Sequence, residues 1–283
     1  MPTKAYLLLL SFILCLFIKI TISTKIWTPI SFARNYFLMS VLSLVSWNID
    51  GLGDDLAPRM DAVYNVLKNI EPNVIFLQEV VRSVIGSLER LRESYEIFYS
   101  DRSCRYFTAI LVKKPFNFLK HNVHAFENSK MARTLQTIEG ELGSMKVFLL
   151  TTHLESLGEN KKERKAQLDY CLQKMKEIAE NNPDAVVFFG GDLNIREKEM
   201  PELPAGVKDA FLEAGSPKDE RFTWDTQKNH NKFAGQAQIR FDRVLWTGPL
   251  QIVSFKLEGR ERLQTVDCFP SDHWAINCTF SAP

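Results

Sequence analysis

The sequence predicts an α/β fold for the part of the chain that begins at Met39. Apolar runs of strand length alternate with helical patterns of apolar residues, and no linker or low-complexity run interrupts this alternation. Several of the apolar runs also end on a polar residue. The length of 283 residues, 45% of them hydrophobic and 24% charged, fits one large globular domain or at most two.

The predicted elements follow in chain order. The first strand, over 41–48, ends at Asn48, and the second, over 73–79, ends at Glu79. A helix between them is indicated by apolar residues at helical spacing, namely Met60, Val63, Leu67 and Ile70. The later elements are a short helix over 83–93, strands over 107–112 and 145–153, a long amphipathic helix over 160–181, and strands over 185–192, 239–246, 250–257 and 274–280.

An apolar run from Ala5 to Ile18 precedes the predicted domain. It is shorter than the about 20 residues that cross a bilayer, and Lys19 interrupts it. The run could be a membrane anchor, a signal peptide with Lys4 at its basic end, or a dispensable extension upstream of a physiological start at Met39. We therefore treat residues 1–38 as an N-terminal extension and keep all three interpretations.

Charge and cysteine spacing exclude several classes of protein. The formal net charge is +1, so any nucleic acid must be bound by a local groove and not by a generally positive surface. Cys104, Cys171, Cys268 and Cys278 show no C-x-x-C spacing, which indicates reduced thiols and not a zinc site or a disulfide framework. Reduced thiols favour the interpretation of residues 1–38 as a dispensable extension.

Residues of catalytic type stand at the ends of predicted strands. Taken singly, each has a structural explanation: Asn48 suits a turn, Glu79 a helix cap, and His153 a hydrogen-bonded buried histidine. Strand ends from distant parts of a chain converge at one edge of such a sheet, so their recurrence favours a common site. The set consists of Asn48, Glu79, His153, Asp192, Asn194, Asp242, Asp272 and His273.

An oxygen-rich set of this kind suits magnesium and phosphate chemistry. Magnesium prefers one or two carboxylates, and Glu79 with Asn48 would hold such an ion. Asp192 would accept a proton from an attacking water. Gly190 and Gly191 lack side chains and would let a phosphate or a water approach the backbone closely.

Asn194 and His273 complete the predicted machinery. Asn194 would project to the same side as Asp192 from an extended segment, and would orient the water or donate to a phosphoryl oxygen. Asp272 beside His273 would raise the pKa of the imidazole and fix its ring, so that a cation faces the phosphorus oxygens. The set predicts metal-assisted hydrolysis of a phosphoester, whereas G-x-S-x-G, P-loop and H-E-x-x-H motifs are absent from the sequence.

Five motifs, in chain order, resemble the endonuclease/exonuclease/phosphatase superfamily with its DNase I-like fold: S-W-N-I-D-G-L, L-Q-E-V, T-H-L-E-S, G-G-D-L-N-I-R and S-D-H-W. Y-F-T-A-I, F-T-W-D-T-Q-K-N-H-N and R-F-D-R narrow the resemblance to the members that cleave 5′-tyrosyl–DNA bonds. The resemblance covers nearly all of residues 39–283, which it marks as the catalytic domain. The implied fold is a four-layer α/β sandwich of two packed mixed β-sheets flanked by helices.

The resemblance also implies an activity. The chain would be a Mg²⁺-dependent phosphodiesterase, with Mn²⁺ also accepted, that hydrolyses 5′-phosphotyrosyl bonds between DNA and trapped topoisomerase II remnants. It would leave a 5′-phosphate during double-strand break repair. Its substrates would be single-stranded or frayed 5′ ends, bound by a monomer without an obligate protein partner. A nuclear location is implied, with the cytoplasm as a second compartment, while residues 5–22 leave a secretory or membrane location open.

Residue roles follow from the same resemblance. Glu79 would bind the metal ion and Asp192 would be the proton acceptor. The path of DNA and phosphate would be lined by Tyr106, Trp224, Phe241 and His273. The 5′-phosphate end would be held by three segments: Asn48, Ile49, Asp50, Gly51 and Leu52; His153, Leu154, Glu155 and Ser156; and Asn194, Ile195 and Arg196.

Three segments depart from the family pattern, one of them G-D-L-N-I-R-E in place of G-D-T-N-L-R-D. Leu157-Gly158 stands where Thr-Arg usually follows H-L-E-S, so one basic contact is missing, and Lys232 stands where an apolar residue is usual. With only 1–38 ahead of the domain, we expect no ubiquitin-binding module there. The alternatives are a lipid phosphodiesterase or inositol phosphatase of the same superfamily, an abasic-site endonuclease, and a catalytically inactive scaffold. An aromatic set favours a DNA groove over a lipid or inositol pocket, namely Tyr106, Trp224 and Phe241.

Overall fold

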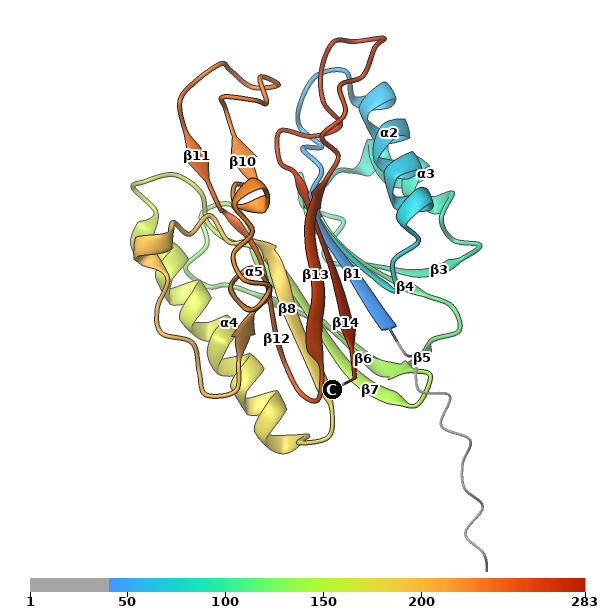
Figure 1. The fold of residues 1–283 in the computed structure, drawn as a ribbon, viewed down its shortest axis with the longest axis vertical. Helices are drawn as coiled ribbons and strands as arrows, with labels where there is room; N and C mark the ends of the chain where they lie inside the picture. Colours follow the sequence, from blue (N-terminus) through green and yellow to red (C-terminus); the bar gives the residue numbers. More distant parts are fainter. Residues whose placement is uncertain (1–40, 283) are drawn as a thin grey trace, which may run out of the picture. The chain divides into compact units, whose positions relative to one another are not determined.

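A computed structural model of the chain describes residues 41–282 (Figure 1). The expectations for the apolar run and for a start at Met39 lie outside these residues. Within 41–282, no helix is long and apolar enough to cross a membrane. The four cysteines of this range are free, as their spacing predicts.

The first sheet is mixed, with six strands in the order β13-β14-β1-β2-β4-β3. β1 and β2 run parallel, whereas the other neighbours are antiparallel. Parallel strands end at the same edge of a sheet, and the register brings Asn48 beside Gln78. The bounds are Val41–Asn48 for β1, Val74–Val80 for β2, Tyr95–Tyr99 for β3, Phe107–Lys113 for β4, Gln251–Glu258 for β13 and Ala275–Ser281 for β14.

The second sheet is also mixed, in the order β5-β6-β7-β8-β12-β9. Only β7 and β8 run parallel. Two further strands, β10 (Trp224–Asp225) and β11 (Gln238–Ile239), form a separate small sheet. The bounds are Asn117–Ala125 for β5, Thr134–Leu142 for β6, Met145–His153 for β7, Val186–Asp192 for β8, Lys208–Asp209 for β9 and Asp242–Thr247 for β12.

The two sheets pack face to face between layers of helices (Figure 1). The core between them takes Leu44 and Phe76 from the first sheet and Leu149 and Phe188 from the second. α2 (Leu56–Ile70) and α3 (Ile85–Glu89) pack on the outer face of the first sheet, and α4 (Lys161–Asn181) on that of the second. The predicted four-layer sandwich is confirmed. The remaining helices are short: α5 (Ala210–Glu213), η1 (Arg82–Val84), η2 (Glu197–Glu199) and η3 (Lys218–Glu220).

Apolar spacing accounts for the two long helices. α2 buries Met60, Val63 and Leu67, and it ends where Glu71 takes a left-handed conformation just before Pro72. α4 buries the apolar stripe that its spacing predicts, Leu168, Cys171, Met175 and Ile178. The helix predicted over 83–93 is shorter and splits into η1 and α3. β3, β5 and β6 carried no prediction.

Candidate active site

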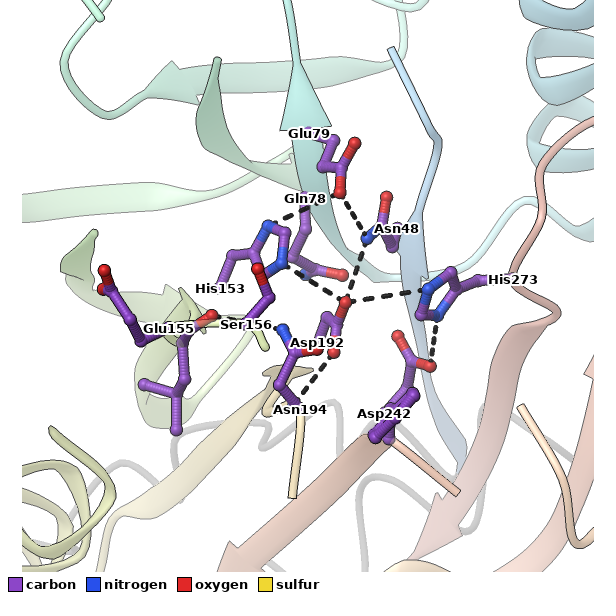
Figure 2. A network of polar contacts seen from close by, with 12 residues as sticks. Asn48, Gln78, Glu79, His153, Glu155, Ser156, Asp192, Asn194, Asp242 and His273 are labelled. Carbon is purple, nitrogen blue, oxygen red and sulfur yellow. Dashed lines mark hydrogen bonds and ion pairs between the residues drawn. The ribbon is translucent and has the colours of Figure 1, made fainter. Parts of the chain in front are cut away.

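Strand register assembles the candidate residues of the second sheet. In the parallel pair β7 and β8, His153 stands opposite Asp192, and in the antiparallel pair β8 and β12, Asp242 stands opposite Asp192. His153, Asp192 and Asp242 therefore form one row across three strands. Asn48 and Glu79 approach this row from the ends of β1 and β2, and His273 from the segment before β14 (Figure 2).

Asp192 is the centre of the polar network in Figure 2. Its Oδ2 accepts a hydrogen bond from Asn48 Nδ2 at 3.0 Å and lies 3.3 Å from His153 Nε2 and 3.7 Å from His273 Nε2. Its Oδ1 accepts from the backbone N–H of Asn194 at 3.0 Å. Burial raises the pKa of Asp192 to about 6, with a contribution from Asp242 that the charge of His273 opposes. The carboxylate is buried yet surrounded by donors, as a proton acceptor requires.

Asp242, and not Asp272, is the carboxylate that holds the ring of His273. His273 Nδ1 lies 2.7 Å from Asp242 Oδ2, and both residues are buried. Burial lowers the pKa of His273, but the charges of Asp242, Asp192 and Asp272 outweigh it and raise that pKa well above the usual value. The prediction that Asp272 fixes the ring is wrong, because the hydrogen-bond partner of the ring is Asp242 on β12, and Asp272 acts on His273 only through its charge.

His153 is held as a neutral imidazole. Its Nδ1 lies 2.7 Å from Arg133 Nη1, which can only donate, and its Nε2 faces the Asp192 carboxylate. The proton therefore belongs on Nε2. Burial, followed by the charges of Arg133 and His273, lowers the pKa of His153 well below its usual value. His153 thus points an N–H toward the Asp192 carboxylate, with Nε2 3.3 Å from Oδ2.

Glu79 leaves the regular geometry of its strand. The pairing of β2 with β4 shifts register between Leu77 and Val80, and Glu79 has a φ of 55°. Its Oε1 accepts from Asn48 Nδ2 at 3.1 Å, so the Asn48 amide bridges Glu79 and Asp192. The Asn48 oxygen accepts from the backbone N–H of Asp50, so Asn48 presents its nitrogen to the two acids.

The charges of Glu79, Asp50 and Asp272 act on one another, and we call these three acids the carboxylate cluster. Carboxylate oxygens are ligands that a hard divalent cation prefers. Burial and then the charge of Asp272 raise the pKa of Glu79 to about 7, and the same two causes raise the pKa of Asp50. A cation among these oxygens would relieve their mutual repulsion. Among residues 41–282, Asp192, Asp242 and His273 are the one group of three whose possible ligand atoms all lie within 4.8 Å of one another, but a 2.7 Å hydrogen bond already joins Asp242 to His273.

A cavity of about 420 Å³ opens beside Asp192. Trp224 and Phe241 form one wall, with ring centroids 5.6 Å apart, and Arg196 brings positive charge. Tyr106 lies in an adjoining recess, where the guanidinium of Arg133 stands 4.8 Å from its ring centroid. The cavity is further lined by Glu79, His153, Ser156, Leu157, Gly158, Arg164, Asn194, Glu199, Ala237, Ile239 and His273.

Several residues of the three predicted substrate-binding segments face away from the cavity. Ile49, Leu154 and Ile195 are buried in the hydrophobic clusters under the helices, because alternate residues of a segment point to opposite sides. Glu155 is fully buried, and its carboxylate accepts hydrogen bonds from Ser129, Lys130 and Gln167. These four residues are buried in this structure, and their contact with the substrate stays a prediction.

Two other expectations about local geometry are also wrong. A Cβ on Gly191, whose φ is 142°, would lie 2.0 Å from Thr152 O, and a Cβ on Gly190 would lie 2.9 Å from Arg243 O. The two glycines thus serve strand packing and not the approach of a phosphate. Asn194 has a φ of 52°, so the segment after Asp192 turns and is not extended. Asn194 and Arg196 nevertheless both line the cavity.

Asp50, Gly51 and Leu52 belong to the loop after β1. Asp50 is buried and faces Lys232 and Arg59, whereas Leu52 is exposed. Gly51 is required for packing, since a Cβ there would lie 2.2 Å from Glu79 O.

Sequence reasoning missed Arg133 and the role of Asp242. Arg133 lies at the start of β6, which carried no prediction, so nothing pointed to it. Asp242 stood among the polar strand residues, and its place inside the R-F-D-R motif was an available signal.

The comparisons agree with this geometry. The model of the Endonuclease/Exonuclease/phosphatase family matches residues 45–273. A 5′-tyrosyl-DNA phosphodiesterase of Caenorhabditis elegans is 54% identical over 244 residues, which is 85% of this chain and 67% of the relative. A crystal structure of TDP2 from C. elegans matches with a TM-score of 0.84 and 52% identity, covering 86% of this chain and 75% of that chain.

A third match carries DNA. The crystal structure of Danio rerio TDP2 complexed with a single-strand DNA product matches with a TM-score of 0.81 and 36% identity, over 86% of this chain and 100% of that one. Because the family model spans most of the chain and the curated relative shares more than half of the matched residues, the likeness extends well beyond the fold. The chain therefore belongs to the endonuclease/exonuclease/phosphatase family and, within it, to the tyrosyl-DNA phosphodiesterases 2.

Proposed function

We propose that residues 39–283 are a catalytic domain that hydrolyses 5′-phosphotyrosyl bonds between DNA and trapped topoisomerase II remnants, in double-strand break repair. The observation that carries the proposal is the hydrogen-bonded network around Asp192, which stands beside a cavity lined by the aromatic rings of Trp224 and Phe241 and by Arg196. The activity of the relatives and the DNA-bound structure of one of them support the same substrate.

Asp192 accepts the proton of the attacking water in this proposal. Three donor groups, on Asn48, His153 and His273, face its Oδ2, and a backbone N–H holds its Oδ1. These contacts fix the direction of the carboxylate, which supports in-line attack on phosphorus. Asn194 donates its side-chain amide to Leu154 O, which keeps its oxygen available to orient the water.

His273 acts as the fixed cation of the site. Its Nδ1 is bound to Asp242, so the remaining N–H, on Nε2, is available to a phosphoryl oxygen. A charged donor in a buried site stabilises the negative charge that develops on the phosphate oxygens. Arg133 brings a second positive charge next to His153.

Glu79 holds a divalent ion, for which we propose Mg²⁺ with Mn²⁺ as a substitute. Bound at Glu79, such an ion would supply Lewis-acid stabilisation of the phosphoryl group and of the phenolate leaving group. Asp272 and Asp50 supply further oxygens or negative charge on the same side. Asn48 keeps Glu79 oriented through its amide nitrogen, and a direct contact of Asn48 with the ion stays a prediction.

The DNA strand lies along Trp224 and Phe241. Aromatic faces accept stacked bases with little sequence preference, which suits single-stranded or frayed 5′ ends. Arg196 contacts a backbone phosphate, and Tyr106 with Arg133 lies near the tyrosyl group. We further propose that the protein works in the nucleus and as a monomer.

Cleavage of an oligonucleotide with a 5′-phosphotyrosine tests the proposal. The protein should release tyrosine, leave a 5′-phosphate and require added Mg²⁺. Glu79→Ala and Asp192→Asn should each lose about 10²-fold or more in turnover. Asp184→Asn, at the exposed opposite end of β8, is the matched control and should keep full turnover. Full turnover by the two site variants would contradict the assignment, and cleavage of a phosphoinositide or sphingomyelin in place of the oligonucleotide would contradict the substrate.

A further inference from the structure

Lys232 lies at the edge of the carboxylate cluster, in the loop between β10 and β11. Its Nζ is 2.6 Å from Asp50 Oδ1; the lysine side chain is 40% exposed and the aspartate side chain 3%. The Lys232 side chain thus extends from solvent to a carboxylate that is almost fully buried. A positive charge in this place must affect any cation that the cluster binds.

The loop does not depend on Lys232 for its position. Asn229 donates its side-chain amide to Ser271 O at 2.8 Å. Asn231 donates to Phe269 O and accepts from the Phe269 N–H, both at 2.8 Å. These bonds already fasten the loop to the segment before His273. A role as a structural tether is therefore redundant for the Lys232 side chain.

Asp50 does not depend on Lys232 for a positive partner either. The buried guanidinium of Arg59 lies 3.6 Å from Asp50 Oδ2 and donates to the carbonyl oxygen of the same residue. Lys232 is consequently an additional positive charge. Partial burial alone would lower the pKa of Lys232, but its hydrogen bond to Asp50 and the charges of Asp50, Asp272 and Glu79 raise that pKa. The ammonium therefore interacts electrostatically with all three acids of the cluster.

We propose that Lys232 is a built-in counter-cation of the carboxylate cluster, which weakens the binding of a divalent ion and strengthens the binding of the anionic substrate. The inference rests on the proposed function, because it takes Glu79 as the residue that holds the ion. Before the ion arrives, Lys232 offsets part of the negative charge that attracts it. Once the ion is bound, the same ammonium adds positive charge beside the cluster, which favours an approaching phosphodiester.

Removal of this charge should have opposite effects on the two ligands. Lys232→Gln keeps a polar side chain that is one bond shorter and removes its charge. Because the lysine is partly exposed, we expect a change of about two- to fivefold, the range of a solvent-screened charge interaction. Mn²⁺ should bind about that much more tightly, and the KM for the phosphotyrosyl oligonucleotide should rise by about the same factor. A purely structural defect would weaken both.

The experiment uses the full chain and two readouts. Mn²⁺ affinity is measured by calorimetric titration without DNA, and KM and kcat are measured at saturating Mg²⁺. Lys232→Arg keeps the charge and should behave like the wild type. Lys228→Gln is the matched control, since this lysine is exposed on the same loop and forms no ion pair within residues 41–282. It should change neither readout, and thermal melting should show that all variants fold.

The outcomes separate the two proposals. Tighter Mn²⁺ binding with a higher KM in Lys232→Gln supports the inference. Weaker or unchanged Mn²⁺ binding overturns it, as does an equal effect of Lys228→Gln. If the wild type binds no Mn²⁺, or if Glu79→Ala does not weaken that binding, the proposed metal role of Glu79 fails first.

Discussion

Substitution of Asp242 by Asn identifies the carboxylate that serves His273. The change keeps the shape of a fully buried side chain but removes the charge 2.7 Å from His273 Nδ1. The pKa of His273 then falls, because burial opposes its charged form. Loss of one donor that stabilises developing charge costs about 10²- to 10³-fold in rate, so we expect kcat to fall within that range. Loss of one charge-assisted hydrogen bond should cost about 1.5–3 kcal/mol of stability.

The assay compares Asp242→Asn with Asp272→Asn on the phosphotyrosyl oligonucleotide over a range of Mg²⁺ concentrations. Asp272 acts on Glu79 and Asp50 through its charge, so its variant should need more Mg²⁺ and recover most of its kcat when Mg²⁺ is raised. The Asp242 variant should not recover. Equal loss of kcat in the two variants at saturating Mg²⁺ would refute this division of roles, and so would wild-type turnover by Asp242→Asn.

Three further predictions concern packing, DNA and metal. Gly191→Ala should destabilise the protein by about 2 kcal/mol or more, seen as a lower melting temperature, because its Cβ would meet Thr152 O at 2.0 Å. Gly158→Ala, where a Cβ meets nothing within 4 Å, should melt like the wild type; equal melting of both variants would contradict the packing argument. Trp224→Ala should weaken DNA binding by about 1–3 kcal/mol in an anisotropy titration. The same variant should turn over a nitrophenyl phosphodiester, which contains no DNA, at the wild-type rate. A loss of activity confined to this small substrate would refute the position of Trp224 on the DNA path. Chelation with EDTA should abolish turnover without unfolding the domain, and Mg²⁺ should restore it; turnover that survives chelation would exclude the metal role.

Continuous apolar runs and helical periodicity predicted the elements that are largely buried. The strands that end at Asn48, Glu79 and Asp192 are nearly continuous apolar runs, and they form where expected. β5 was not predicted because its side chains are almost all exposed, so its sequence shows no apolar alternation. Its position in the sheet comes from backbone pairing with β6, which a pattern of side chains does not report.

The candidate site was predictable as a set of residues but not as a set of contacts. Strand ends pointed to Asp192 and His273, yet the partner of His273 comes from β12, and sequence adjacency pointed to Asp272 instead. Likewise, the three predicted binding segments contain buried residues such as Leu154, since sequence proximity to a catalytic residue does not reveal which side of the chain faces the cavity.

Because His153, Asp192 and Asp242 form one row across three strands, enzymatic activity depends on the correct register of those strands. A slip of one residue in either strand pairing would turn the side chains of one strand to the opposite face of the sheet. A compact chain with a shifted strand would therefore retain its helices and much of its core but have no turnover. For this protein, the number of active sites titrated in a preparation should equal the number of molecules whose central strands are in register. Circular dichroism of the same preparation would not provide this number.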